Sequence, residues 1–142
     1  MSEPKVIFTP WKQWDERKDI KNAERTGVYL LAHFSRRPNR DVPASPLDEH
    51  IVYIGETHRQ TLQKRWSDFN RSAQTGKKGH AGGRTYHDRF SRIRDDLYVA
   101  AYTPEQPDWT PRCRSFFISR VESRLIWNSA TACKPDKLCN KD

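Results

Sequence analysis

The stretch Ile51-Val52-Tyr53-Ile54-Gly55-Glu56-Thr57 decides the fold. This apolar run carries one tyrosine, stops at a glycine and then turns polar, which is typical of a buried strand that ends at a turn. Residues 27–34 form a second run of the same kind, with β-branched, aromatic and aliphatic side chains after a glycine. Because only a loop joins the two runs, we expect them to form an antiparallel pair of strands.

The connection between these strands, residues 35–49, is rich in proline and charge and is predicted to be a loop. It carries Arg36 and Arg37, whose guanidinium groups are candidates for contacts with a nucleic-acid backbone.

A helix is predicted after the second strand, because apolar side chains recur at helical spacing. The apolar face consists of Leu62, Trp66, Phe69 and Ala73. Thr57 or Thr61 is expected to cap the helix start. Arg65 lies at the border of the apolar face, where it either points along the sheet edge or packs its stem on Trp66.

Residues 76–89 are basic and rich in glycine, and we expect a flexible loop there. The segment lacks the G-x-x-x-x-G-K-[ST] pattern of a nucleotide-binding P-loop. Lys77, Lys78 and Arg84 are candidate phosphate contacts, and a mobile solvated loop is the equally weighted alternative.

A third strand is predicted at residues 97–102, followed by a helix from about residue 111 to 127. Glu122 lies between Ile118 and Ile126 in an apolar row of this helix. A carboxylate in such a row is expected to be paired in a salt bridge, protonated or bound to a metal.

The N-terminal extension, residues 1–26, is expected to begin with a short strand near residues 6–8. Trp11 and Trp14 are close enough to share a helical face and are expected to cover one edge of the core. Stacking of these tryptophans on bases is the less favoured alternative.

The bulk properties fit one domain over residues 1–142, with 35% apolar residues, 31% charged residues and a net charge of +8. This excess of positive charge favours a polyanionic partner, nucleic acid before an anionic membrane. No apolar run approaches the ~20 residues of a membrane span. We expect a cytoplasmic protein without a signal peptide, whose three cysteines are reduced thiols.

The order of these motifs resembles the GIY-YIG nuclease superfamily over roughly residues 27–140. The first motif corresponds to Gly27-Val28-Tyr29 and the second to Tyr53-Ile54-Gly55. Arg65 ends an L-x-x-R pattern, Glu122 stands where the family keeps its metal-binding glutamate, and Asn140 resembles the asparagine that closes the pattern. The resemblance implies an α/β chain of the α+β type, with a three-stranded, mostly antiparallel sheet flanked by helices.

The chain also departs from the family pattern. Residues 35–49 correspond to an insertion, and Phe69 stands where some relatives carry a histidine one turn after the arginine. His80 or Tyr86 is a candidate to fill that auxiliary role. Asn128 competes with Asn140 for the role of the closing asparagine.

The resemblance implies a metal-dependent endonuclease that acts on DNA, with no small-molecule cofactor. Tyr29 is expected to be the general base and Tyr53 to orient water or phosphate, while Arg65 clamps the phosphate. A phenol has a pKa near ~10, and nearby cations would favour its ionised form. Glu122 alone suffices to bind Mg²⁺ or Mn²⁺, because Mg²⁺ often takes one or two carboxylates plus water.

Two further interpretations stay open from the residues. One is a non-catalytic nucleic-acid-binding module on the same fold, and the other is a basic adaptor that binds protein. The nuclease and the nucleic-acid-binding module would show a DNA affinity that falls with salt, whereas the adaptor would not.

Overall fold

The two tyrosine strands are neighbours in an antiparallel sheet of four strands, ordered β1-β4-β2-β3. The computed structural model describes residues 4–106 and 108–132. The strands are β1 (Lys12–Gln13), β2 (Gly27–His33), β3 (Ile51–Thr57) and β4 (Leu97–Tyr102). The predicted antiparallel pair and third strand are confirmed, and the two-residue strand β1 is an addition to the three strands expected.

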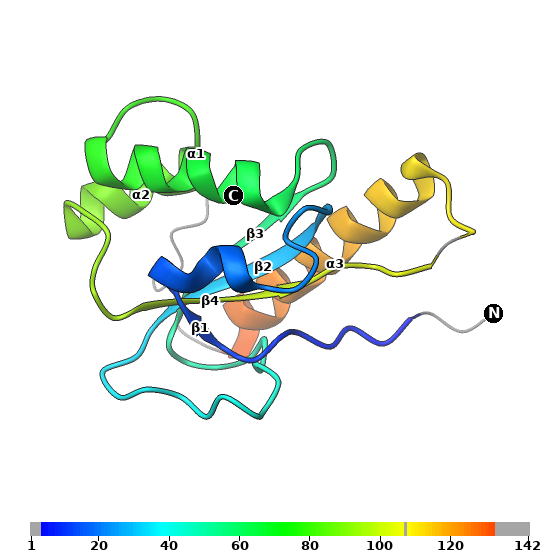
Figure 1. Cartoon of the computed structure of the whole chain (residues 1–142), viewed down its shortest axis with the longest axis horizontal. Helices are drawn as coiled ribbons and strands as arrows, with labels where there is room; N and C mark the ends of the chain where they lie inside the picture. Colours follow the sequence, from blue (N-terminus) through cyan, green and yellow to red (C-terminus); the bar gives the residue numbers. More distant parts are fainter. Residues whose placement is uncertain (1–3, 107, 133–142) are drawn as a thin grey trace.

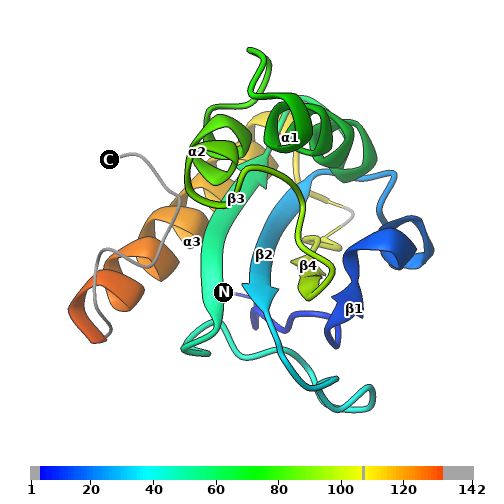
Figure 2. The ribbon, with the colours of Figure 1, turned by 90° about the vertical axis from the view of Figure 1, so that its left-hand side faces the viewer.

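Helices cover both faces of the sheet, which gives an α+β architecture (Figures 1 and 2). They are the 3₁₀ helix η1 (Trp14–Asp19) and the α-helices α1 (Leu62–Thr75), α2 (Ala81–Phe90) and α3 (Pro111–Ala132). The pair α1 and α2 lies side by side on one face, and α3 packs on the other, mainly against β3 and β2. Among these described helices, none has the length and apolar character needed to cross a bilayer.

The period-2 alternation of the strands divides the core between the two faces. Tyr29, Leu31 and Tyr53 belong to the cluster under α1 and α2. Val28, Leu30 and Ile54 belong to the cluster under α3. Tyr29 and Tyr53 therefore project toward the same pair of helices.

The predicted helix after β3 is confirmed in detail. Leu62, Trp66, Phe69 and Ala73 are fully buried. The cap is Thr61, whose Oγ1 accepts a hydrogen bond from the backbone N–H of Lys64 at 3.1 Å. The later helix, α3, is also present and extends to Ala132, five residues beyond its expected end.

The prediction of a flexible loop over residues 76–89 is wrong, because residues 81–90 form α2. Gly82 and Gly83 are buried inside this helix and do not mark a turn. A Cβ at position 83 would lie 2.8 Å from the carbonyl oxygen of Phe69, so the glycine allows α2 to pack closely on α1. The helical propensity lost at two glycines is offset by this close packing.

The N-terminal extension contributes to both sides of the core. Trp11 packs edge-on against Phe34 under α3, whereas Trp14 packs against Trp66 and Phe69 under α1. Both tryptophans are buried, as the core-covering interpretation expects, but they face opposite sides of the sheet. No strand forms at residues 6–8; the first strand is β1.

Candidate functional site

Tyr29 and Tyr53 lie against each other because a glycine stands between them. Tyr29 on β2 is paired with Gly55 on β3, and the two tyrosine rings are 5.8 Å apart. A Cβ at position 55 would lie 2.4 Å from Cζ of Tyr29 and 2.5 Å from Cε2 of Tyr53. Gly55 therefore lets the two phenols approach, and each side chain affects the pKa of the other.

His80 joins the two phenols from the start of α2. Its Nε2 lies 2.9 Å from the hydroxyl oxygen of Tyr29, and the histidine side chain is buried. Its ring also contacts the ring of Tyr53 edge-on at 5.7 Å. His80 therefore contacts both phenols from α2.

The hydrogen bonds of His80 define which ring nitrogen carries the proton. Nδ1 accepts a hydrogen bond from the backbone N–H of Gly83 at 3.2 Å, as the N-cap of α2. Burial, with Arg65 nearby, lowers the pKa of His80 to about 3, so the ring is neutral at pH 7. Because Nδ1 is an acceptor, the proton must be on Nε2, which donates to the Tyr29 oxygen.

Close packing of α2 holds this arrangement in place. A Cβ at position 82 would lie 2.3 Å from Cε1 of Tyr53, so only glycine lets the helix start rest on that ring. His80 is anchored further because its backbone N–H donates to Oγ of Ser72 at 3.1 Å. The pair Tyr29–His80 is therefore built by α1, α2 and the sheet together.

Both phenols are protonated in the free protein. Burial raises the pKa of Tyr29 well above its usual value, and it raises the pKa of Tyr53 to about 12. Arg65 acts in the opposite direction on both groups, but its effect is smaller than that of burial. The expectation that nearby cations would favour an ionised phenol is therefore outweighed by desolvation.

Arg65 and Glu122 reach this site from opposite faces of the sheet. Arg65 is on α1 and Glu122 is on α3, and the two charges are close enough to influence each other and both phenols. They can approach each other because β3 is the edge strand of the sheet formed by the described residues (Figure 2). Within the described residues, the Arg65 guanidinium forms neither an ion pair nor a side-chain hydrogen bond.

Glu122 is a half-buried carboxylate with a second carboxylate beside it. Burial comes first and repulsion from Glu56 second among the causes that raise the pKa of Glu122 to about 7. Arg65 and His58 act in the opposite direction. The salt bridge considered from the sequence is not formed between Glu122 and any described residue.

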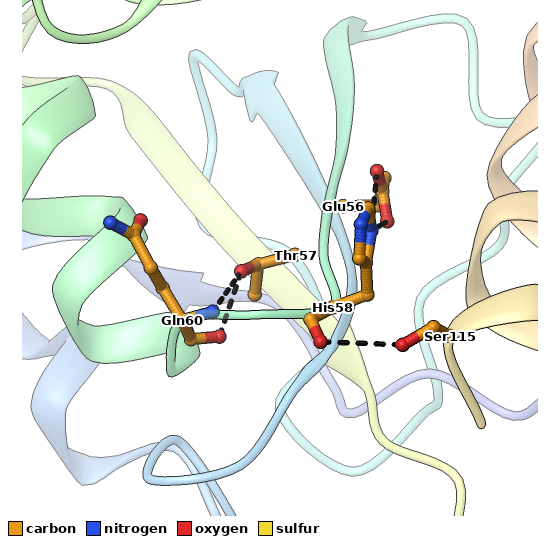
Figure 3. A network of polar contacts seen from close by, with 5 residues as sticks. All are labelled: Glu56, Thr57, His58, Gln60 and Ser115. Atoms are coloured by element: carbon orange, nitrogen blue, oxygen red, sulfur yellow. Dashed lines mark hydrogen bonds and ion pairs between the residues drawn. The ribbon is translucent and has the colours of Figure 1, made fainter. Parts of the chain in front are cut away.

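A polar network at the end of β3 holds Glu56 in place (Figure 3). His58 Nδ1 lies 2.9 Å from a carboxylate oxygen of Glu56, and the carbonyl oxygen of His58 accepts from Oγ of Ser115 on α3 at 3.4 Å. Oγ1 of Thr57 donates to the carbonyl oxygen of Gln60 at 2.7 Å, which closes the turn into α1. Glu56 is therefore paired with His58.

Tyr86 does not join the site. Its hydroxyl oxygen lies 2.8 Å from Nε2 of His33 and accepts from the backbone N–H of Arg94. This network is near the far end of β2, four residues along the strand from Tyr29. Of the two auxiliary candidates, His80 is the one whose contacts with the phenols are established.

The predicted phosphate contacts lie at different distances from the site. Lys77 and Lys78 are exposed between α1 and α2, and Arg84 is exposed on α2. Arg36 and Arg37 belong to the loop at the opposite end of β2, away from α1 and α2 (Figure 1). Asn140 lies outside the described residues. The competing Asn128 lines a pocket between α3 and residues 4–6.

The sequence interpretation missed two supporting residues, Gly82 and His58. A glycine inside a basic, glycine-rich segment carries no sign that a tyrosine far away in the sequence will rest on it. His58 is only two residues from Glu56, and this spacing at a strand end was the available signal.

Comparisons with known proteins found no relative of this chain. No family model matches the chain, and neither a curated protein nor a solved structure matches it. The geometry of the site and the order of its motifs therefore carry the functional argument.

Proposed function

We propose that the protein is a metal-dependent endonuclease of the GIY-YIG type, which hydrolyses phosphodiester bonds in DNA. One observation carries this proposal: Tyr29, Tyr53, Arg65 and Glu122 come from four different elements and interact electrostatically at one place. Four buried or half-buried polar side chains are costly to bring together without a function. The net charge of +8 agrees with a polyanionic substrate.

Arg65 is suited to clamp the phosphate that is cleaved. Its guanidinium group presents a planar fork that matches two phosphate oxygens. Because no described carboxylate engages it, an incoming phosphate would not have to displace an existing partner.

The carboxylates suit a hard divalent cation. Repulsion between Glu56 and Glu122 would be relieved by a cation that binds the Glu122 carboxylate, with Glu56 close by. The described residues contain no group of three or more metal-binding side chains, but Mg²⁺ often takes only one or two carboxylates. When bound, Mg²⁺ or Mn²⁺ would stabilise negative charge on the phosphate.

The order of the hydrogen bonds favours Tyr53 as the phenol that meets the attacking water. Tyr29 is fully buried, whereas Tyr53 is 8% exposed. His80 donates to the Tyr29 oxygen, and a bond from the Tyr29 hydroxyl to the Tyr53 oxygen would stabilise a developing phenolate on Tyr53. We therefore propose Tyr53 as the general base and Tyr29 as its support, the reverse of the roles that the resemblance implies.

Nicking of supercoiled plasmid DNA with Mg²⁺ or Mn²⁺ tests the proposal. Glu122→Gln and Arg65→Ala should each abolish nicking, since they remove the metal-binding carboxylate and the phosphate clamp. Arg71→Ala, an exposed arginine on the same helix as Arg65, is the matched control and should retain activity. If either site variant nicked the plasmid at the wild-type rate, the assignment would be overturned.

The binding-module alternative gives a different result in the same assay. It predicts a gel shift with DNA but no nicking by the wild-type protein with either metal. The assignment of the base is tested with Tyr53→Phe, which should abolish cleavage, and Tyr29→Phe, which should retain a slow reaction. Equal loss in both variants would argue against Tyr53 alone as the base.

A further inference from the structure

A polar pocket opens where β3 passes into α1, with a volume of about 450 Å³. Three arginines line it: Arg25, Arg59 and Arg114. They come from the connection before β2, the turn after β3 and the first turns of α3. We refer to it as the arginine pocket.

The guanidinium groups of this pocket are not engaged by other described side chains. Within residues 4–106 and 108–132, none of the three forms an ion pair or a side-chain hydrogen bond. Glu24 and Glu105 also line the pocket, and the Glu105 carboxylate accepts a hydrogen bond from Asn22 at 3.0 Å. The lining therefore keeps an excess of positive charge, which favours an anion.

Hydrogen bonds connect the backbone segments around the arginine pocket. The carbonyl oxygen of Arg25 accepts from the backbone N–H of Leu62 at 2.8 Å, which ties its segment to the start of α1. The turn that carries Arg59 is closed by the bonds between Thr57 and Gln60. Ser115, next to Arg114, donates to the carbonyl oxygen of His58 on the same turn (Figure 3). The three arginines thus start from a preformed backbone, which lowers the cost of binding.

The pocket lies close to the candidate active site. Glu56 and Arg59 are three residues apart, so their Cα atoms are separated by at most about 11 Å. A strand of duplex DNA advances about 3.4 Å per nucleotide along the helix axis. The spacing therefore corresponds to about three nucleotides or fewer.

We propose that the arginine pocket binds a backbone phosphate of the DNA strand, within about three nucleotides of the point where that strand passes Glu56 in the candidate active site. The inference rests on the proposed nuclease function. It adds a contact that positions the strand and contributes to affinity without taking part in the chemistry. Unlike Arg36 and Arg37, these arginines line a pocket next to the end of β3, the strand that carries Glu56.

The test measures DNA binding separately from cleavage. Fluorescence anisotropy of a short labelled duplex is recorded over a series of NaCl concentrations, with Glu122→Gln as the background so that the DNA stays intact. Adding Arg59→Gln should weaken binding and reduce the slope of log K against log salt by about 0.9, the effect of one lost phosphate contact. Arg59→Lys should keep most of the slope.

Arg92→Gln in the same background is the control for a general loss of charge. Arg92 is exposed in the segment before β4, at the other end of the sheet from the pocket, and should leave the slope unchanged. Thermal unfolding of each variant should match the background protein, since all these arginines are at the surface or half-exposed.

A final arm locates the contact. Once the cleaved bond is mapped with wild-type protein, a neutral methylphosphonate is placed at each of the three flanking positions in turn. At the contacted position, Arg59→Gln should cause no further loss of affinity. If Arg59→Gln lowers the affinity equally for the duplexes modified at each of the three positions, the placement near the cleaved phosphate is overturned.

The outcomes for the pocket and for the nuclease are distinguishable. The pocket proposal fails and the nuclease stands if wild-type protein nicks DNA but the pocket variants keep the full slope of log K against log salt. The pocket variants are Arg59→Gln and a triple variant in which Arg25, Arg59 and Arg114 are all changed to Gln. If no DNA is nicked but the slope falls in the pocket variants alone, the phosphate contact stands and the nuclease fails. Equal slope changes in Arg59→Gln and Arg92→Gln would overturn the pocket.

Discussion

At the residue scale, the site depends on the direction in which each hydrogen bond points. His80 accepts at Nδ1 from the backbone of Gly83, so its proton is directed at Tyr29 from Nε2. The buried ring is thus both a helix cap and a donor to the phenol. Two functions of one side chain can be separated by substitution.

His80→Asn and His80→Ala should differ in stability but agree in activity. Asparagine is a good N-cap and should keep the bond to Gly83, but it is too short to reach Tyr29. Alanine should lose both contacts and cost about 1 kcal/mol more than asparagine in free energy of unfolding. Urea denaturation measures the first property and plasmid nicking the second; full activity of His80→Asn would exclude a role for the Tyr29 contact.

Glu122 should make the protein less stable as pH rises. Its folded pKa of about 7 lies above the unfolded value near 4.5, so the folded state binds more protons between these values. Stability from this group is therefore present below about pH 4.5 and is lost as pH rises through about 7. In urea denaturation, the stability of Glu122→Gln relative to wild type should increase from pH 5 to pH 7.5; a constant difference would contradict the raised pKa.

At the element scale, α2 is the helix whose sequence pattern predicted a loop. Its composition resembles a loop, but its two buried glycines are where it meets Tyr53 and α1. Helix propensity and tertiary packing make opposite demands here, and packing prevails. This conflict predicts the sign of a substitution.

Gly82→Ala should destabilise the protein, although alanine is the better helix former. Propensity alone would add about 0.5–1 kcal/mol of stability. A Cβ placed 2.3 Å from the Tyr53 ring forces α2 or the ring to move, at a typical cost of about 1–3 kcal/mol. Thermal unfolding should show a net loss, whereas Asp88→Ala on the exposed side of α2 should be neutral. A stabilised Gly82→Ala protein would contradict the close packing.

At the scale of the whole molecule, the site exists because β3 is at the edge of the sheet. The phenols and Arg65 come from the layer with α1 and α2, and Glu122 comes from the layer with α3. The two layers share one sheet and should unfold together.

Ile118→Ala tests this coupling from the α3 side. Ile118 is fully buried one turn before Glu122, and its truncation should cost about 2–5 kcal/mol. Because the layers share the sheet, tryptophan fluorescence and far-UV circular dichroism should report the same lowered midpoint in urea. Separate midpoints for the two signals would show that the layers unfold independently.

Much of this organisation could be predicted from local patterns. Apolar periodicity located β2, β3, β4, α1 and α3, because the spacing of side chains along an element depends only on backbone geometry. Side-chain chemistry left Thr57 or Thr61 as the cap, and the structure shows that it is Thr61. The helix α2 and the short strand β1 could not be predicted, since both depend on neighbours that are distant in the sequence.

By itself, the sequence determined the α+β class, the pairing of the two tyrosine strands and the residue types from which the site is proposed. Only the tertiary structure decided that His80 and not Tyr86 reaches Tyr29, that Glu56 is held by His58 near Glu122, and that three arginines surround one pocket. The physical reason is that periodicity encodes which face of an element is buried. Which polar groups meet across elements depends on close approaches such as those at Gly55 and Gly82, which exist only once the chain has packed.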